Sequence, residues 1–302
     1  MELVFLGTRG DLEKKTRRHR RHSALLIKEV NARVLIDCGA DWLGRIEALR
    51  PTAIVVTHGH ADHAWGLANG APCTVYATAE TWQLLAAYPI SKRQIMPERK
   101  PIDVCGICFE AFPVEHSILA PAVGYRIAAN RRSAFYVPDV VAICDPEAAL
   151  RGIELYIGDG ASVTRPIIRR RGAVCIGHTP IRTQLDWCRA QSVARATFTH
   201  CGAQIVGGDG RVLGALVRRL GRERGVEARI AYDGMELSLD ELLRKGLGRA
   251  AVVALDPRSL TVPCPSCPEG QAQRSLSVVC GGRDPRSTQI KRGRFQSVGK
   301  DD

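Results

Sequence analysis

The chain has 302 residues, of which 45% are apolar, 25% charged and 5% aromatic. This composition excludes disorder throughout the chain and is sufficient for one sizeable core. No apolar run approaches the roughly 20 residues of a membrane-spanning helix, and residues 1–5 lack the pattern of a secretion signal. Eleven cysteines, an odd number, predict reduced thiols in such a chain. We therefore expect a cytoplasmic protein without a membrane partner.

Basic residues outnumber acidic residues by 43 to 31, which gives a formal net charge of +12. The excess is uneven, because residues 9–21 hold seven basic and two acidic residues, with His19 and His22 in addition. Such a surplus predicts attraction to polyanions, although it carries no information about the fold.

Short apolar runs alternate with longer helical patterns from residue 3 to about residue 243, which indicates an α/β fold. In chain order, strands are expected at residues 3–6, 23–27, 34–36, 53–57, 75–77, 109–114, 134–137, 155–157, 174–176, 196–199 and 228–231. Helices are expected at residues 42–49, 79–87, 181–191, 212–224 and 239–244.

The composition changes after Lys245. Residues 257–302 are rich in Pro, Gly, Ser, Arg and Gln and contain few large apolar side chains, so we expect this part to be flexible. The sequence therefore predicts one domain at residues 1–245 and a basic Pro/Gly/Ser-rich tail at residues 246–302.

Two pairs of cysteines have the spacing of metal ligands. Cys264 and Cys267 in the tail, with Cys280 thirteen residues later, form a zinc-ribbon pattern that lacks its fourth ligand, so metal binding there stays open. Cys105 and Cys108 have the same spacing, but the glycine between them and the flanking apolar runs favour a hairpin turn.

The densest cluster of polar residues follows the apolar run at residues 53–56. It contains four potential metal ligands within six residues, namely His58, His60, Asp62 and His63. Buried imidazoles and carboxylates each need partners, so a cluster of this density is costly unless a cation or solvent compensates it. We interpret this segment as a metal-binding loop rather than as a solvated loop that is rich in histidine.

Three further apolar runs end in potential ligands. Residues 109–114 lead to His116, residues 134–137 to Asp139 and residues 196–199 to His200. Each of these side chains alone could be an ordinary core or turn residue. Strand ends meet at one edge of a sheet, however, so together with the upstream cluster they predict one site.

The number of ligands indicates two metal ions. We expect one ion at His58, His60 and His116, a second at Asp62, His63 and His200, and Asp139 shared by both. Nitrogen-rich ligation favours zinc, with manganese or iron as alternatives. Two ions about 3.5 to 4 Å apart would hold a bridging hydroxide and lower its pKa toward about 7, which makes a nucleophile at neutral pH.

The loop at residues 58–63 matches the H-x-H-x-D-H signature of the metallo-β-lactamase-fold hydrolases, and the chain resembles that family from residue 1 to about residue 245. The resemblance includes the segments Leu6-Gly7-Thr8, Leu35-Ile36-Asp37-Cys38-Gly39 and Tyr232-Asp233-Gly234-Met235. It implies a four-layer αββα sandwich with a binuclear site at the edges of the sheets. Asp37 and Asp159 would then fix ligands or loops, although either could be a simple turn former.

Two positions separate the branches of this family. The diiron oxidoreductase variant favours H-x-E-x-D, whereas this chain has histidine at position 60. True β-lactamases lack the bridging carboxylate that Asp139 would provide. The sequence is thus closer to the branches that hydrolyse phosphodiesters or thioesters.

Three segments are most similar to ribonuclease Z and to the cyclic phosphodiesterase of phosphonate breakdown, namely Leu6-Gly7-Thr8, Gly177-His178-Thr179 and Phe198-Thr199-His200. Ribonuclease Z carries a long tRNA-gripping insertion between the ligands that match His116 and Asp139. Only 22 residues separate them here, which two strands and a turn would use completely. The compact phosphodiesterase is therefore the closer relative.

We hypothesise that a metal-bridging hydroxide attacks phosphorus, that Asp62 orients it, and that His178 protonates the departing alkoxide. His178 could instead cap the helix expected after it. The basic segment that follows the first expected strand is interpreted as a loop on the substrate side. It is expected to contact a phosphodiester substrate through Arg17, Arg18, Arg20, Arg21 and His22. That substrate could be a nucleotide, a cyclic nucleotide, RNA or DNA. A solvated basic face, without a substrate role, is the alternative for this loop.

Other functions and properties stay open. The same metal site could hydrolyse a thioester or an amide, including a β-lactam. The basic segments could also belong to a nucleic-acid-binding protein with vestigial activity. A second arginine-rich run at residues 165–171 is expected on the surface without a function. The sequence does not decide whether the protein forms a homodimer.

Overall fold

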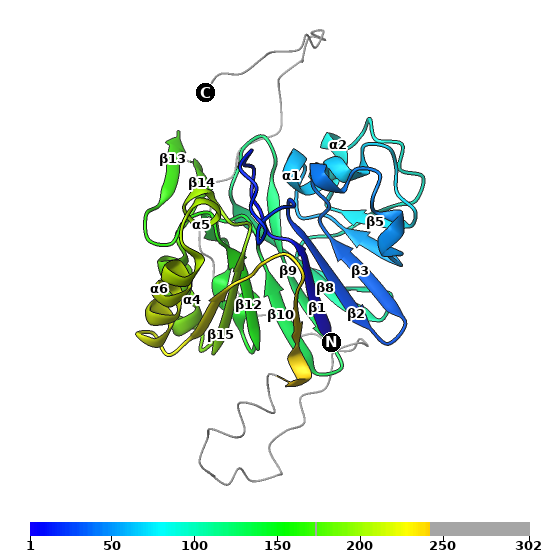
Figure 1. The fold of residues 1–302 in the computed structure, drawn as a ribbon. Coiled ribbons are helices and arrows are strands. Elements are labelled where there is room, and N and C mark those ends of the chain that lie inside the picture. The colour runs from blue at the N-terminus through cyan, green and yellow to red at the C-terminus, as the bar shows by residue number, and fades with distance from the viewer. Residues whose placement is uncertain (173, 242–302) are drawn as a thin grey trace, which may run out of the picture. The chain divides into compact units, whose positions relative to one another are not determined.

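The computed structural model describes residues 1–172 and 174–241. The predicted tail, with Cys264, Cys267 and Cys280, lies outside the described residues. Within the described part, two sheets face one another and helices cover their outer sides, as Figure 1 shows.

The first sheet contains seven strands, which are β1 (Glu2–Gly7), β2 (Ala24–Glu29), β3 (Ala32–Ile36), β4 (Ala53–Val55), β5 (Thr74–Ala77), β6 (Arg93–Ile95) and β17 (Met235–Ser238). Their order is β17-β1-β2-β3-β4-β5-β6. On its outer side lie α1 (Ala61–Ala64), α2 (Ala79–Leu84) and the 3₁₀ turns η1 (Ala40–Trp42), η2 (Glu47–Leu49) and η3 (Trp65–Leu67).

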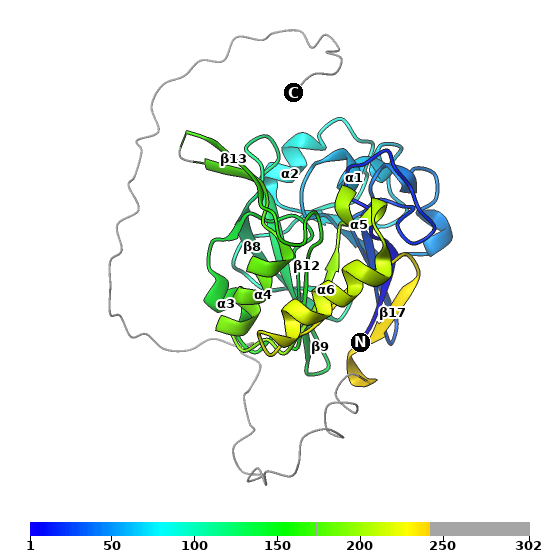
Figure 2. The ribbon, with the colours of Figure 1, turned by 60° about the vertical axis from the view of Figure 1, so that its left-hand side comes forward.

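The second sheet contains β7 (Ile102–Val104), β8 (Ile107–Glu115), β9 (Ala122–Ala129), β10 (Arg132–Tyr136), β11 (Ala142–Ile143), β12 (Leu155–Asp159), β15 (Arg195–Thr199) and β16 (Glu227–Ile230). The order is β11-β8-β9-β10-β12-β15-β16, and β7 pairs with β8. Its helices are α3 (Pro146–Leu150), α4 (Ile181–Ala190), α5 (Ala203–Gly207) and α6 (Gly210–Arg222). A separate hairpin consists of β13 (Ile167–Arg171) and β14 (Val174–His178), and it projects beyond the second sheet (Figure 2).

Alternation along the strands explains the layers. In β1, Leu3 and Phe5 belong to the cluster between the sheets, whereas Val4 belongs to the cluster under the outer turns and helices. Successive side chains of a strand point to opposite faces, so each sheet buries both of its faces. A third cluster packs α4 and α6 against the outer face of the second sheet. The predicted αββα sandwich is confirmed.

Most of the expected elements are present, with shifts of a few residues at their ends. The turn expected at Gly106 is confirmed, because β7 and β8 form a hairpin around it. The two strands and turn expected between His116 and Asp139 are β9 and β10. None of the described helices is long and apolar enough to cross a membrane.

One predicted helix is wrong. Residues 42–49 form parts of the two short turns η1 and η2 instead, and Gly44 lies between them with φ of 70°. That left-handed backbone conformation cannot continue a right-handed helix. The sequence pattern also missed β13, because all five of its side chains are exposed and three of them are arginines.

Candidate metal centre

The first group of candidate ligands lies on the loop that leaves β4. His60 is the N-cap residue of α1, and Asp62 and His63 lie within this short helix, where both are buried. Gly59 allows the loop to pack closely, since a Cβ there would lie 2.7 Å from Cδ1 of Leu84 on α2. The dense ligand spacing thus results from a strand, a tight turn and one helical turn.

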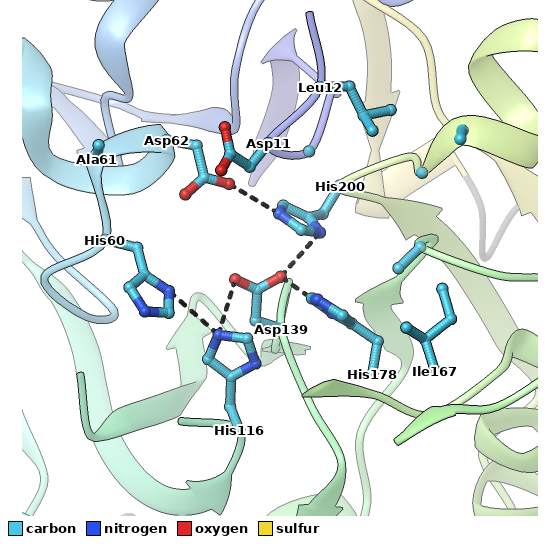
Figure 3. A pocket seen from close by; sticks show the side chains of 14 residues that line it. Asp11, Leu12, His60, Ala61, Asp62, His116, Asp139, Ile167, His178 and His200 are labelled. Carbon is cyan, nitrogen blue, oxygen red and sulfur yellow. Dashed lines mark hydrogen bonds and ion pairs between the residues drawn. The ribbon is translucent and has the colours of Figure 1, made fainter. Parts of the chain in front are cut away.

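The second sheet supplies the other candidate ligands from its strand ends. His116 directly follows β8, Asp139 lies three residues after β10, and His200 directly follows β15. β10, β12 and β15 are parallel, so their carboxyl ends share one edge of the sheet. Figure 3 shows His116, Asp139 and His200 pointing toward His60 and Asp62 of the first sheet's loop. The structure therefore brings together all seven side chains that the sequence singled out.

These seven side chains form two groups of four that share Asp139, namely His58, His60, His116 and Asp139, and Asp62, His63, Asp139 and His200. In the first group, Nδ1 of His60 is 2.9 Å from Nε2 of His58 and 3.2 Å from Nε2 of His116. Oδ2 of Asp139 is 3.2 Å from Nε2 of His58. Ligand atoms about 2.0 to 2.1 Å from a tetrahedral ion lie about 3.3 Å from one another, which matches this spacing.

The second group has similar separations. Oδ2 of Asp62 lies 2.9 Å from Nε2 of His200 and 3.3 Å from Nε2 of His63. Nε2 of His63 is also 3.0 Å from Oδ2 of Asp139. His200 has φ of 50°, a strained value for a residue other than glycine, and such strain is typical of functional sites.

Three buried atoms of the cluster have no hydrogen-bond partner among the described residues. They are Nε2 of His63, Oδ1 of Asp139 and Nδ1 of His200. Nδ1 of His200 is 2.8 Å from Oδ1 of Asp139, but their arrangement is not that of a hydrogen bond. Polar atoms buried without partners are costly, and a cation between them would remove that cost. These residues fit divalent metal ions.

The pKa shifts favour the metal-binding form in His58, His60 and Asp139, whereas neighbouring carboxylates outweigh burial and raise the pKa of His63 and of His200. Burial, and then repulsion by His116, lowers the pKa of His60 to about 4, and burial also lowers the pKa of His58. Burial alone would raise the pKa of Asp139, but the nearby imidazoles of His200 and His63 outweigh it and hold that pKa well below its usual value. Neutral imidazoles and ionised carboxylates are the forms that coordinate metals.

Asp37 and Asp159 are fully buried and hold candidate ligands and loops in place. Oδ2 of Asp37 lies 2.8 Å from Nδ1 of His63, and Asp37 also accepts hydrogen bonds from Thr57. Asp159 accepts from the backbone of Ala161 and lies 2.8 Å from Nδ1 of His178. A carboxylate on the far nitrogen fixes the orientation of a histidine, which is the role expected for both residues.

The two groups lie at a pocket of about 430 Å³. His60, Asp62, His116, Asp139 and His200 line it, together with residues from the loop after β1, from the β13–β14 hairpin and from the start of α5 (Figure 3). Its volume is in the range of sites that hold one small ligand, roughly 300–1,000 Å³.

His178 also lines this pocket, with its side chain about one fifth exposed. It is the last residue of β14, and the helix expected after it begins three residues later with Pro180 as the N-cap residue. Because Pro180 is the N-cap residue, His178 does not cap α4. Burial lowers the pKa of His178, but the carboxylate of Asp159 outweighs burial and raises that pKa above the usual value.

The predicted substrate contacts occupy a different position. From the loop after β1, the pocket is lined by Gly10, Asp11 and Leu12, and its lining does not include Arg17, Arg18, Arg20, Arg21 or His22. The guanidinium of Arg18 lies over the ring of Tyr232, and that of Arg21 over the ring of Trp42. Nδ1 of His22 lies 3.0 Å from Oδ2 of Asp41.

Sequence reasoning missed the residues that shape the pocket and its loop. Ile167 lines the pocket, yet it belongs to a strand without an alternating pattern. Gly10 lies against His200, where a Cβ would be 3.0 Å from Cε1 of its ring. Arg9 is buried and paired with Asp41. In the sequence, the one signal for these residues is the pair Arg9-Gly10 in a basic segment, and such a pair is not specific for a pocket.

Comparison with known families agrees with this geometry. The β-lactamase superfamily domain matches residues 32–201, more than half of the chain. The chain belongs to this superfamily and has the metallo-β-lactamase fold.

Individual relatives are more distant. Ribonuclease Z from Bradyrhizobium diazoefficiens is 26% identical over 245 residues, with 67% of this chain and 79% of that protein covered. Ribonuclease Z from Oceanobacillus iheyensis is 29% identical over 153 residues, which cover 42% of this chain and about half, 49%, of that protein. The crystal structure of a diphosphatase from the PhnP family superposes with a TM-score of 0.58 at 21% identity, covering 78% of this chain and 96% of that chain. At this identity the likeness shows the fold alone.

Proposed function

We propose that the protein is a metal-dependent phosphodiesterase that uses two divalent cations to hydrolyse a nucleotide, a cyclic nucleotide or a nucleic acid. The observation that carries this proposal is the pair of four-ligand groups sharing Asp139 beside an open pocket. Two ions held close together suit in-line displacement at phosphorus, because they can act on the attacking and the departing oxygen.

The comparisons support the same chemistry. Two relatives are named ribonuclease Z. A ribonuclease cleaves at phosphorus rather than at a carbonyl carbon. Ligands rich in imidazole favour zinc, with manganese and iron as alternatives.

The residues divide the work as follows. His58, His60 and His116 would hold one cation and Asp62, His63 and His200 the other, with Asp139 shared between them. When bound, the cations supply a water-derived nucleophile at neutral pH and offset negative charge on the phosphoryl oxygens. Asp37 keeps the ring of His63 in its orientation.

Two further side chains would act on the reacting groups. The carboxylate of Asp62 lines the pocket and would accept a hydrogen bond from the water-derived nucleophile, and so orient it. His178 lines the same pocket, and Asp159 favours its protonated form. Its free ring nitrogen, Nε2, would donate a proton to the departing alkoxide, which is the role of a general acid.

Metal analysis followed by a substrate panel tests the proposal. We expect about two ions per chain, and turnover of a bis-aryl phosphate that a chelator abolishes and added zinc restores. The panel should also contain a 2′,3′-cyclic nucleotide, single-stranded DNA, precursor RNA, a thioester and a β-lactam. Asp139→Asn serves as the control, because it removes the shared charge and should reduce both metal content and turnover. Faster hydrolysis of the thioester or β-lactam than of every phosphodiester would contradict the proposal.

A further inference from the structure

The β13–β14 hairpin carries an unusual concentration of exposed charge. Arg169, Arg170 and Arg171 follow one another in β13, and all three are exposed. None of the three side chains has an ion pair or hydrogen bond to another described residue, whereas Arg99, Arg132 and Arg224 elsewhere on the surface are paired with carboxylates. Arginines without a carboxylate partner are available to bind an external anion.

The register of the hairpin assigns these arginines to its two faces. Ile167 is paired with His178, and both line the pocket, so their shared face is directed toward the metal centre (Figure 3). Residues two apart in a strand share a face, so Arg169 and Arg171 lie on this face and Arg170 lies on the opposite one. The pocket-side arginines begin with Arg169, two residue pairs from Ile167, and continue outward along the strand.

A second hollow continues the pocket in the same region. It has a volume of about 540 Å³ and shares Ala161, Ile167 and Ala203 with the pocket of the metal centre. Arg165 lines it, is exposed, and has a side chain that is unpaired among the described residues. The surface available to a substrate therefore extends past the ligands toward cationic groups.

We propose that Arg165, Arg169 and Arg171 bind successive phosphates of a single-stranded polynucleotide. This inference rests on the proposed function, since it places the scissile phosphodiester of that strand at the metal centre. Arg169 and Arg171 are separated along β13 by two residues, or about 7 Å. A mononucleotide or cyclic nucleotide within the pocket would not extend along this face, so only a longer strand uses it.

The same face offers apolar contacts. Ile167 and Val174 are exposed to 47% and 41%, and Ile176, which is paired with Arg169, lies on the same face. Bases of a single strand are apolar on their flat faces and gain from such contacts, while a positively charged groove follows the backbone. A duplex would present phosphates but not base faces, so the combination favours a single strand.

Binding measurements test this inference without reliance on turnover. The probe is a labelled 20-nucleotide single strand with phosphorothioate linkages, which resist hydrolysis, in RNA and DNA forms, measured by fluorescence anisotropy against the metal-loaded full chain. Replacing Arg169→Ala together with Arg171→Ala should weaken binding roughly tenfold and reduce the slope of log affinity against log salt by about 1.4, since each lost phosphate contact contributes about 0.7 for a single strand.

Arg170→Ala is the matched control for Arg169→Ala and Arg171→Ala made singly, because each removes one charge from the same strand and Arg170 lies on the other face. It should change affinity by less than about twofold, because its side chain is directed away from the proposed phosphate contacts. The double change to Lys keeps the charges and should restore the salt slope, which separates charge from damage to the hairpin. An equal loss with Arg170→Ala, or no loss with the double Ala variant, would overturn the inference.

The inference and the proposed function can fail separately. Hydrolysis of a bis-aryl phosphate should be unchanged in the double Ala variant, because that substrate does not reach beyond the pocket. Hydrolysis without arginine-dependent strand binding would overturn the inference alone. Arginine-dependent binding without hydrolysis of any phosphodiester would overturn the proposed function and leave the docking face in place.

Discussion

Two basic segments border the pocket, and they use their charges differently. The loop after β1 contributes Gly10, Asp11 and Leu12 to the lining, and the β13–β14 hairpin contributes Ile167 and His178. Both segments are rich in arginine, and the sequence alone favoured the loop as the substrate-binding element. The two segments differ in the partners that their basic side chains contact.

The loop uses much of its charge internally. Arg9 and Lys15 pair with Asp41, and the guanidinium groups of Arg18 and Arg21 lie over aromatic rings. The hairpin has no such partners for its arginines among the described residues, although its base is fixed by the backbone hydrogen bond from Gly177 to His116. Equal charge density in a sequence can therefore mean a braced loop in one place and an open binding face in another.

The largest expected effect comes from the base of the hairpin. His178→Ala should lower turnover by roughly 10²- to 10⁴-fold on a substrate with an alkoxide leaving group, as expected for a lost general acid. Turnover of bis-p-nitrophenyl phosphate should fall far less, because nitrophenolate leaves without protonation. Steady-state kinetics with both substrates and metal analysis of the variant check this. Loss of metal from the variant would show that His178 holds the site together instead.

The next prediction tests whether these internal contacts stabilise the loop after β1. Arg9 is buried to 1% exposure and pairs with Asp41, which Lys15 and the backbone of His22 also contact, so Arg9→Leu removes one of three partners of this carboxylate. We expect a loss of about 1–3 kcal/mol in the free energy of unfolding, measured by urea denaturation. The exposed Arg17→Leu is the control and should change stability by less than about 0.5 kcal/mol. Equal stabilities of the two variants would contradict the bracing role.

His19 allows a second test of the internal contacts of this loop, through the pH dependence of the free energy of unfolding. Burial, and then the nearby Arg18, lowers its pKa to about 4, and its Nδ1 lies 2.8 Å from Oγ1 of Thr8. A folded-state pKa below the unfolded value of about 6.5 means that the unfolded chain binds the proton more tightly. The contribution of His19 to the free energy of unfolding is thus fully present above pH 6.5. It falls by about 3 kcal/mol as the pH decreases to about 4.

Urea unfolding of the protein and of His19→Gln at several pH values isolates this contribution. The difference in unfolding free energy between the two should change in that pH window and stay constant above pH 7. Taking the difference removes the titration of the histidines at the metal centre. A difference independent of pH between 4 and 7 would show that His19 is solvated in the folded protein.

The sequence predicted which candidate ligands come together better than it predicted their surroundings, for physical reasons. Candidate ligands such as His116 and His200 directly follow buried strands, and parallel strands bring their ends together. The substrate-facing surface depends on which arginines find a carboxylate or an aromatic ring, and such long-range contacts leave no periodic pattern. β13 shows this most clearly, because an exposed strand of isoleucines and arginines lacks the alternation that identifies β-structure.

The smallest expected effect concerns the loop arginines that the sequence pointed to. Arg17 and Arg20 are exposed, and neither lines the pocket. Replacing both with Ala should reduce affinity for the single-stranded probe by less than about threefold at 0.1 M salt, since screening weakens distant charges. Anisotropy measured beside the Arg169 and Arg171 double variant gives the comparison directly. A loss as large as that of the hairpin variant would restore the loop as a substrate-binding element and place the strand across both segments.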